Sequence, residues 1–133
     1  MKNIDDTINR ILKMRTIAVV GLSPKPERAS HDVARYLLSQ GYKIIPVNPV
    51  QEEILGLKCY PNLSAIPEPV DLVDVFRRPE HCPPIAQEAV AIGAKALWLQ
   101  LGIVNEDAAR IASDAGLLVV MDHCLKIEHG RRR

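Results

Sequence analysis

Apolar residues in the first third of the chain switch between helical spacing and an unbroken run. Helical spacing over residues 4–14 predicts an amphipathic helix with Asn3 as its cap. The continuous run over 16–20 predicts a strand that is buried on both faces. Helical spacing returns over 33–38, and we expect Ser30 to cap this second helix. The N-terminal region therefore predicts a helix, a strand and a helix in succession.

The rest of the chain continues this alternation. Strand-type runs occupy 44–47, 72–76, 96–99 and 117–120, and helix-type stripes occupy 85–90, 108–115 and 125–129. Pro46 has no N–H to donate, so its strand is expected at a sheet edge or at an early break in the ladder. Asp74 interrupts an apolar run, which predicts a polar neighbour for its carboxyl group. The proline-rich stretch 48–69 predicts loops, with a short strand near Cys59–Tyr60 and a helical turn at 63–66.

Strands that alternate with helices along the whole chain favour one fold class. They predict an α/β, Rossmann-like, doubly wound and mostly parallel sheet with helices on both faces. The length of 133 residues fits a single domain over 1–133. Within it, we expect 1–15 to form an N-terminal helix packed on the domain and 130–133 to form a flexible tail.

Charge and composition exclude several classes of function. The 17 basic and 16 acidic residues give a net charge of +1, so the basic footprint of a nucleic-acid-binding protein is missing. No apolar run reaches the ~18 residues of a membrane span, and the N-terminus does not resemble a secretion signal. The three cysteines show no zinc or redox spacing, which fits free thiols in a reducing cytoplasm. We therefore expect a cytoplasmic protein with a small-molecule ligand.

The loop Gly21–Ser30 follows the first strand, at the sheet edge where α/β proteins bind ligands. Only Gly21 remains of the three glycines in a dinucleotide fingerprint, and no acid follows the second strand to hold a ribose. A serine-hydrolase elbow at Ser23 is disfavoured because Pro24 cannot lend an N–H to an oxyanion hole. These departures argue against both NAD binding and hydrolysis.

Two positive charges in this loop suggest a site for phosphate groups. Lys25 and Arg28, the hydroxyls of Ser23 and Ser30, and the N-terminus of the following helix could hold phosphates together. Taken alone, the two charges are better explained as solvated loop residues.

A second basic segment shifts this balance. Phe76, Arg77 and Arg78 also follow a strand, and an aromatic ring beside guanidinium groups suits a flat base with an extra phosphate. Because both segments are expected at one sheet edge, they favour a polyanionic nucleotide. His31 and His123 are left open as either structural or functional residues.

The segments AVVGLSPKPERASHDVARYL, YKIIPVNP, LGLKCYPNLSAIP, VDLVDVFRRPE, GAKALWLQLGI and AGLLVVMDHCLKIEH together resemble the small stand-alone CoA-binding proteins. The domain of these proteins is similar to the N-terminal CoA-binding domain of the succinyl-CoA synthetase α-subunit. The resemblance runs from Thr16 to His129 and implies a Rossmann-like fold that binds CoA or an acyl-CoA. The ligand-binding residues that follow from the loop pattern and the resemblance are Gly21, Leu22, Ser23, Lys25, Arg28 and Ser30, then Val47, Asn48 and Pro49, then Phe76, Arg77 and Arg78.

The function expected from the sequence is CoA or acyl-CoA binding without catalysis by this chain. The synthetase keeps its phosphorylated histidine in a second domain and uses an ATP-grasp partner, and 133 residues leave room for neither. Two alternatives stay open, namely an NAD(P)-linked oxidoreductase and an interaction subunit of a larger acyl-CoA enzyme. A homo-oligomer is also left open. Arg77 or Arg78 is expected to hold the 3′-phosphate of CoA.

Overall fold

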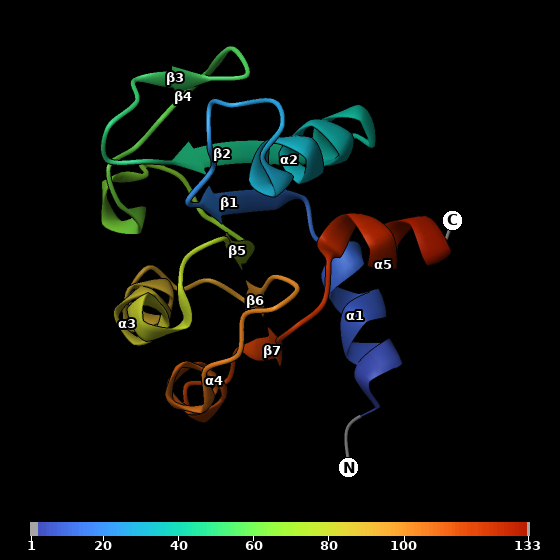
Figure 1. The fold of residues 1–133 in the computed structure, drawn as a ribbon. Coiled ribbons are helices and arrows are strands. Elements are labelled where there is room, and N and C mark those ends of the chain that lie inside the picture. Colours follow the sequence, from blue (N-terminus) through green and yellow to red (C-terminus); the bar gives the residue numbers. More distant parts are fainter. Residues whose placement is uncertain (1–2, 133) are drawn as a thin grey trace.

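A five-stranded parallel sheet forms the centre of the protein, in a computed structural model that describes residues 3–132 (Figure 1). Its strands are β1 (Thr16–Val20), β2 (Lys43–Val47), β5 (Leu72–Val75), β6 (Ala96–Leu99) and β7 (Leu118–Val120). Their spatial order is β2-β1-β5-β6-β7, so the chain adds β2 on one side of β1 and the later strands on the other. The direction of winding therefore reverses between β1 and β5, and ligands bind at such a point in open parallel sheets.

Helices cover both faces of this sheet. They are α1 (Ile4–Leu12), α2 (Ala29–Ser39), α3 (Cys82–Ala91), α4 (Glu106–Asp114) and α5 (Leu125–Arg131). Figure 1 shows α1, α2 and α5 on one face and α3 with α4 on the other. Two separate apolar clusters fill the layers between the helices and the sheet. The strands are buried on both faces, as their continuous apolar runs predict, and the doubly wound α/β fold is confirmed.

The segment between β2 and β5 is the least regular part of the fold. Pro46 lies in β2 at the sheet edge, as predicted. A two-stranded hairpin of β3 (Glu53–Ile54) and β4 (Leu57–Lys58) follows, and then a 3₁₀ turn, η1 (Leu63–Ala65), where the sequence predicted a helical turn. The strand predicted near Cys59–Tyr60 lies earlier, in β4, and Tyr60 contributes only an isolated bridge to β2.

Two side chains behave differently from the sequence-based expectation. Ser30 does not cap α2, because Arg28 occupies the N-cap position and Ser30 lies one residue inside the helix. Asp74 does not find a polar neighbour. Its register neighbours in the sheet are Val19 and Trp98, it is fully buried, and neither carboxyl oxygen has a hydrogen-bond partner.

The two ends of the described chain pack against each other. Helix α1 buries Ile8 and Ile11 in the same apolar cluster as residues of α2 and α5. The expected flexible tail is not observed over 130–132, because α5 continues to Arg131 and Arg132 bonds to α1. Residues 1, 2 and 133 lie outside the described part. No helix within 3–132 is long and apolar enough to cross a membrane.

Candidate functional site

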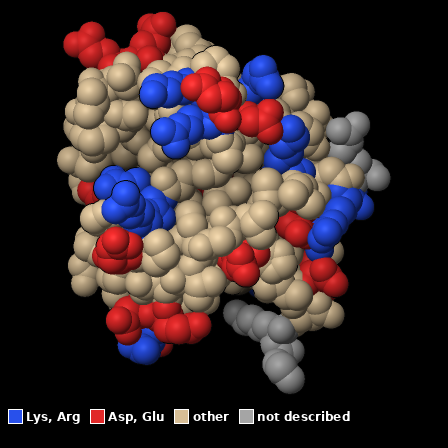
Figure 2. All heavy atoms as spheres, in the orientation of Figure 1, with Lys and Arg blue, Asp and Glu red and all other residues tan. Residues whose placement is uncertain are grey.

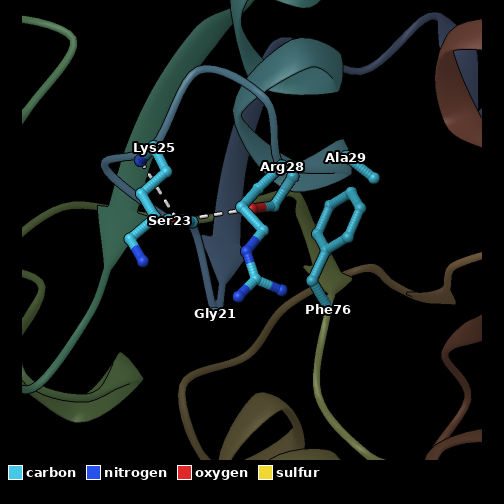
Figure 3. Close-up of a pocket in the computed structure, with 7 residues that line it drawn as sticks. Gly21, Ser23, Lys25, Arg28, Ala29 and Phe76 are labelled. Atoms are coloured by element: carbon cyan, nitrogen blue, oxygen red, sulfur yellow. Dashed lines mark hydrogen bonds between the residues drawn. The ribbon is translucent and has the colours of Figure 1, made fainter.

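A cavity of about 310 Å³ lies at the carboxyl ends of β1 and β5, where the winding of the sheet reverses (Figure 3). The loop from β1 to α2, the first turn of α2 and the residue after β5 form its walls. Its lining residues are Gly21, Ser23, Lys25, Arg28, Ala29, Ser30 and Phe76. All of these except Ala29 are predicted ligand-binding residues, so the fold brings the two predicted segments together.

Gly21 forms the base of the cavity, and no other residue fits there. Its φ of +85° is unfavourable for residues with a side chain. A Cβ at this position would lie 2.5 Å from the carbonyl oxygen of Phe76 and 3.0 Å from Cδ of Arg77. The single glycine of the loop is therefore required for the close approach of the segments that follow β1 and β5.

Two serine hydroxyls hold the loop in shape. The N–H of Ser23 donates to Oγ of Ser30 at 2.9 Å, and the N–H of Lys25 donates to Oγ of Ser23 at 3.1 Å. Ser30 is buried and thus connects the start of the loop to α2, which replaces the capping role predicted for it. Neither hydroxyl donates to another group within residues 3–132, so both protons can serve a ligand.

The N-terminus of α2 opens on the cavity without a side-chain cap. The N-cap residue Arg28 makes no side-chain capping bond, whereas Asn3 and Asn105 cap α1 and α4. First-turn N–H groups and the helix dipole attract anions when no side chain occupies them. The one helix that lines the cavity therefore keeps its N-terminus open for an anionic group.

The cations of the loop have no acidic partners. Among residues 3–132, neither Lys25 nor Arg28 takes part in an ion pair, whereas Lys43, Lys95 and Lys126 each pair with an acid. In Figure 3, the guanidinium of Arg28 lies between Gly21 and Phe76. Both charges are exposed and uncompensated, so an anion entering the cavity would meet two free cations.

Arg77 and Arg78 lie beside the cavity and do not line it. Both side chains are exposed, and the stem of Arg77 passes over Gly21. Figure 2 shows Lys and Arg side chains gathered over the loop that follows β1 and, separately, between the ends of β5 and α3. Uncharged surface lies between the two groups.

The predicted residues after β2 support the loop and are not part of the cavity lining. Asn48 donates from Nδ2 to the carbonyl of Leu22 at 3.0 Å, and its Oδ1 accepts from the N–H groups of Val50 and Gln51. Leu22 and Val47 are buried, and Pro49 is exposed outside the cavity. Asn48 therefore ties the two loops together, a role that needs the parallel register of β1 and β2 and is not visible in the sequence.

The histidines differ in their surroundings. His31 is buried in the first turn of α2, and its Nδ1 has no hydrogen-bond partner. His123 faces Glu128 at 3.3 Å, and its carbonyl oxygen accepts from Nε1 of Trp98, which supports a structural role. No group of three or more potential metal-ligating side chains occurs within residues 3–132.

Asp74 lies in the strand beneath Phe76. Phe76 directly follows β5, two positions after Asp74, so the two side chains face the same side of the sheet. Complete burial raises the pKa of the Asp74 carboxyl group well above its usual value and so favours its protonated form. An unsatisfied carboxyl group thus lies in the core below the cavity wall.

Comparison with known proteins assigns the chain to a family. A family described as CoA binding domain matches residues 15–130. The chain belongs to this CoA-binding domain family. Within it, the chain is 44% identical over 117 residues to the uncharacterized protein YneT of Bacillus subtilis, covering 88% of this chain and 87% of that protein. A solved structure of a hypothetical protein from Pyrococcus horikoshii has a TM-score of 0.92 and 40% identity, and covers 98% of this chain and 96% of that one.

The family domain also occurs inside larger enzymes. The chain is 25% identical to an ADP-forming acetate–CoA ligase of Archaeoglobus fulgidus over 128 residues. This match covers 89% of the chain and only 19% of the ligase, so the chain corresponds to about a fifth of that enzyme. The expected similarity to part of a larger acyl-CoA-forming enzyme is thus found for an acetate–CoA ligase.

Proposed function

We propose that the protein binds CoA, free or acylated, at the cavity between the ends of β1 and β5. One observation carries the proposal: two unpaired cations, two serine hydroxyls with free protons and an uncapped helix N-terminus converge on one cavity. Such a set of donors suits phosphate oxygens. Membership of the CoA-binding domain family supports CoA as the ligand that carries these phosphates.

The alternative of an NAD(P)-linked oxidoreductase has less support at this site. The segment after β2 offers Asn48, whose amide is already bonded to the neighbouring loop, in the position where an acid would hold the ribose of NAD. CoA instead places three phosphate groups and an adenine on one ligand. The two basic groups and the Phe76 ring supply contacts of that kind.

The chain acts as a binding module without catalysis of its own in this proposal. Its larger relatives carry the domain within ligases, which supports docking onto an acyl-CoA enzyme as the second candidate role. Free thiols at Cys59, Cys82 and Cys124 support a reducing compartment such as the cytoplasm. Co-purification from native cells separates a docked subunit from a separate CoA-binding protein or a self-dimer.

The test is a direct binding measurement with a matched charge control. Native mass spectrometry and thermal shift should detect CoA on the wild-type protein and not NAD at equal concentration. The variant Lys25→Gln/Arg28→Gln should lose the CoA-dependent shift, because it removes both free cations of the cavity. Lys95→Gln also removes one exposed Lys charge, but Lys95 pairs with Asp71 at the opposite edge of the sheet, and this variant should keep the shift. No CoA binding by the wild type would refute the proposal.

A further inference from the structure

The shape of the cavity indicates which phosphate it accommodates. Its base is closed where Gly21 meets the carbonyl of Phe76, and the buried Ser30 forms a wall. A cavity that is closed at its base and open to solvent above it suits a terminal group, whereas a phosphate that links two halves of a ligand needs an exit on both sides. We propose that this cavity binds the 3′-phosphate monoester of CoA, while the diphosphate lies outside it along Arg77 and Arg78. This inference rests on the proposed function and reverses the expectation that Arg77 or Arg78 holds the 3′-phosphate.

The charges in the cavity match a phosphate monoester. Such a group carries about −1.5 to −2 near neutral pH and presents three acceptor oxygens on one phosphorus. Each phosphorus of a diphosphate linkage carries about one charge and has substituents on both sides. Lys25 and Arg28 supply two free positive charges beside the open end of α2.

The hydrogen-bond donors show the same match. The hydroxyl oxygens of Ser23 and Ser30 each accept one backbone N–H, which leaves each hydroxyl one proton to donate. Accepting a hydrogen bond polarises a hydroxyl and strengthens its own donation. Two hydroxyl donors and two cations around one small cavity are enough to surround the oxygens of a single terminal phosphate.

The position of Phe76 connects this assignment to the base. In CoA, the ribose that carries the 3′-phosphate also carries the adenine, so the base must lie within one sugar of the phosphate. Phe76 lines the cavity and is only partly buried, so its ring can contact the adenine at that distance.

Arg77 and Arg78 are suited to a group that passes along the surface. Both are exposed, neither lines the cavity, and neither is in an ion pair within residues 3–132. Cδ of Arg77 lies 3.0 Å from the position that a Cβ on Gly21 would occupy, so this side chain passes beside the base of the cavity. A diphosphate leaving the ribose would reach these two guanidinium groups outside the pocket.

The experiment compares CoA with dephospho-CoA, which lacks only the 3′-phosphate, by calorimetric titration of the full chain. Wild type should bind CoA about ten- to a hundredfold more tightly, the effect of one charge-assisted phosphate contact. Arg28→Gln should bring the two dissociation constants close together. The matched control Arg77→Gln should weaken both ligands and leave their ratio unchanged. Both positions are exposed, and an unchanged circular dichroism spectrum would verify folding.

Two results would overturn the assignment while leaving CoA binding intact. One is equal affinity of the wild type for CoA and dephospho-CoA. The other is a ratio that survives Arg28→Gln and disappears in Arg77→Gln, which would place the 3′-phosphate on the outer arginines. Failure of the wild type to bind either compound would instead refute the proposed function itself.

Discussion

Where α5 packs against α1, polar and charged groups are paired within the protein, whereas around the cavity they are not. Arg132 donates to Asp5, Asn9 and Glu128, and Asn3 caps α1. The hydroxyl of Tyr42 donates to the carbonyl of Leu12. Each of these contacts satisfies a hydrogen-bond donor or acceptor that would otherwise depend on solvent or remain unpaired.

At the cavity, the same kinds of group are left unsatisfied. Lys25 and Arg28 lack acidic partners, α2 lacks a cap, and the buried side chains of His31 and Asp74 keep polar atoms without partners on the α2 side of the sheet. Proteins keep such unsatisfied groups mainly at functional sites, at a cost in stability. The contrast therefore separates a contact that stabilises the fold from a region arranged for a ligand.

The largest expected effect is at the base of the cavity. Gly21→Ala should destabilise the protein by about 3 kcal/mol, since it adds a clash with the Phe76 carbonyl to the strain of a positive φ. Gly41→Ala is the matched control, because Gly41 has a φ of +92° and open space around its Cβ. It should cost about 1 kcal/mol. Urea unfolding of both variants measures the difference in their free energies of unfolding. Equal losses of stability would show that the contact between Gly21 and the Phe76 carbonyl can relax.

The next effect is a gain in stability. Asp74→Val should stabilise the protein by about 2 kcal/mol at neutral pH, because it removes an unsatisfied buried carboxyl group. The pKa of Asp74 is raised by burial, so its native form favours the proton. The contribution of Asp74 to folding stability is therefore greatest below the pKa that this group has in the unfolded chain. It decreases as pH rises above about 4. The gain from Asp74→Val should accordingly shrink below about pH 4.

Asp71 provides the control for this measurement. Its carboxylate accepts from the N–H groups of Arg15 and Thr16 and pairs with Lys95. Although burial alone raises the pKa of Asp71, these hydrogen bonds outweigh it and lower the value. Asp71→Asn should therefore destabilise the protein near pH 7, with a loss that fades as the solution is acidified. A loss of stability in Asp74→Val at pH 7 would contradict the difference drawn between the unsatisfied Asp74 and the hydrogen-bonded Asp71.

The sequence allowed much of this architecture to be predicted, because strand burial and loop charge are local properties. Continuous apolar runs predicted the parallel strands, and Pro46 predicted the edge. The cluster of Gly21, Lys25 and Arg28 was predictable because all three lie in one loop at the carboxyl end of a strand. These predictions needed only spacing and residue type.

Other features depend on chain segments that meet only after folding. The pairing of Arg132 with Asp5 spans nearly the full chain, so a terminal arginine run looked like a solvated tail. Ser30 holds Ser23 because the loop folds back over seven positions. The isolation of Asp74 follows from strand register, which sets Val19 and Trp98 beside it.

A smaller effect is expected at the α1–α5 contact. Burial raises the pKa of Glu128, but the hydrogen bond from Arg132 and contacts with His123 and Arg131 lower it by more. Arg132→Gln should therefore cost about 1.5 kcal/mol near pH 7. The loss should disappear as pH falls through the pKa of Glu128, because a depressed pKa stabilises only the ionised form. Arg131→Gln, at a mostly exposed side chain, should cost less than about 0.5 kcal/mol in the same pH series.

The smallest effect comes from applying the same Lys→Gln change on α5 and in the cavity loop. Lys126→Gln removes an ion pair with Asp32 and should cost about 0.3 kcal/mol, since both side chains are partly exposed to solvent. Lys25→Gln should cost nothing measurable without ligand, because no acid pairs with this cation within residues 3–132. With CoA present the order should reverse, and Lys25→Gln should lose more melting temperature relative to wild type than Lys126→Gln. Parallel thermal melts with and without CoA measure both steps. A cost from Lys25→Gln in the absence of ligand would mean that the loop charge stabilises the fold and is not kept for binding.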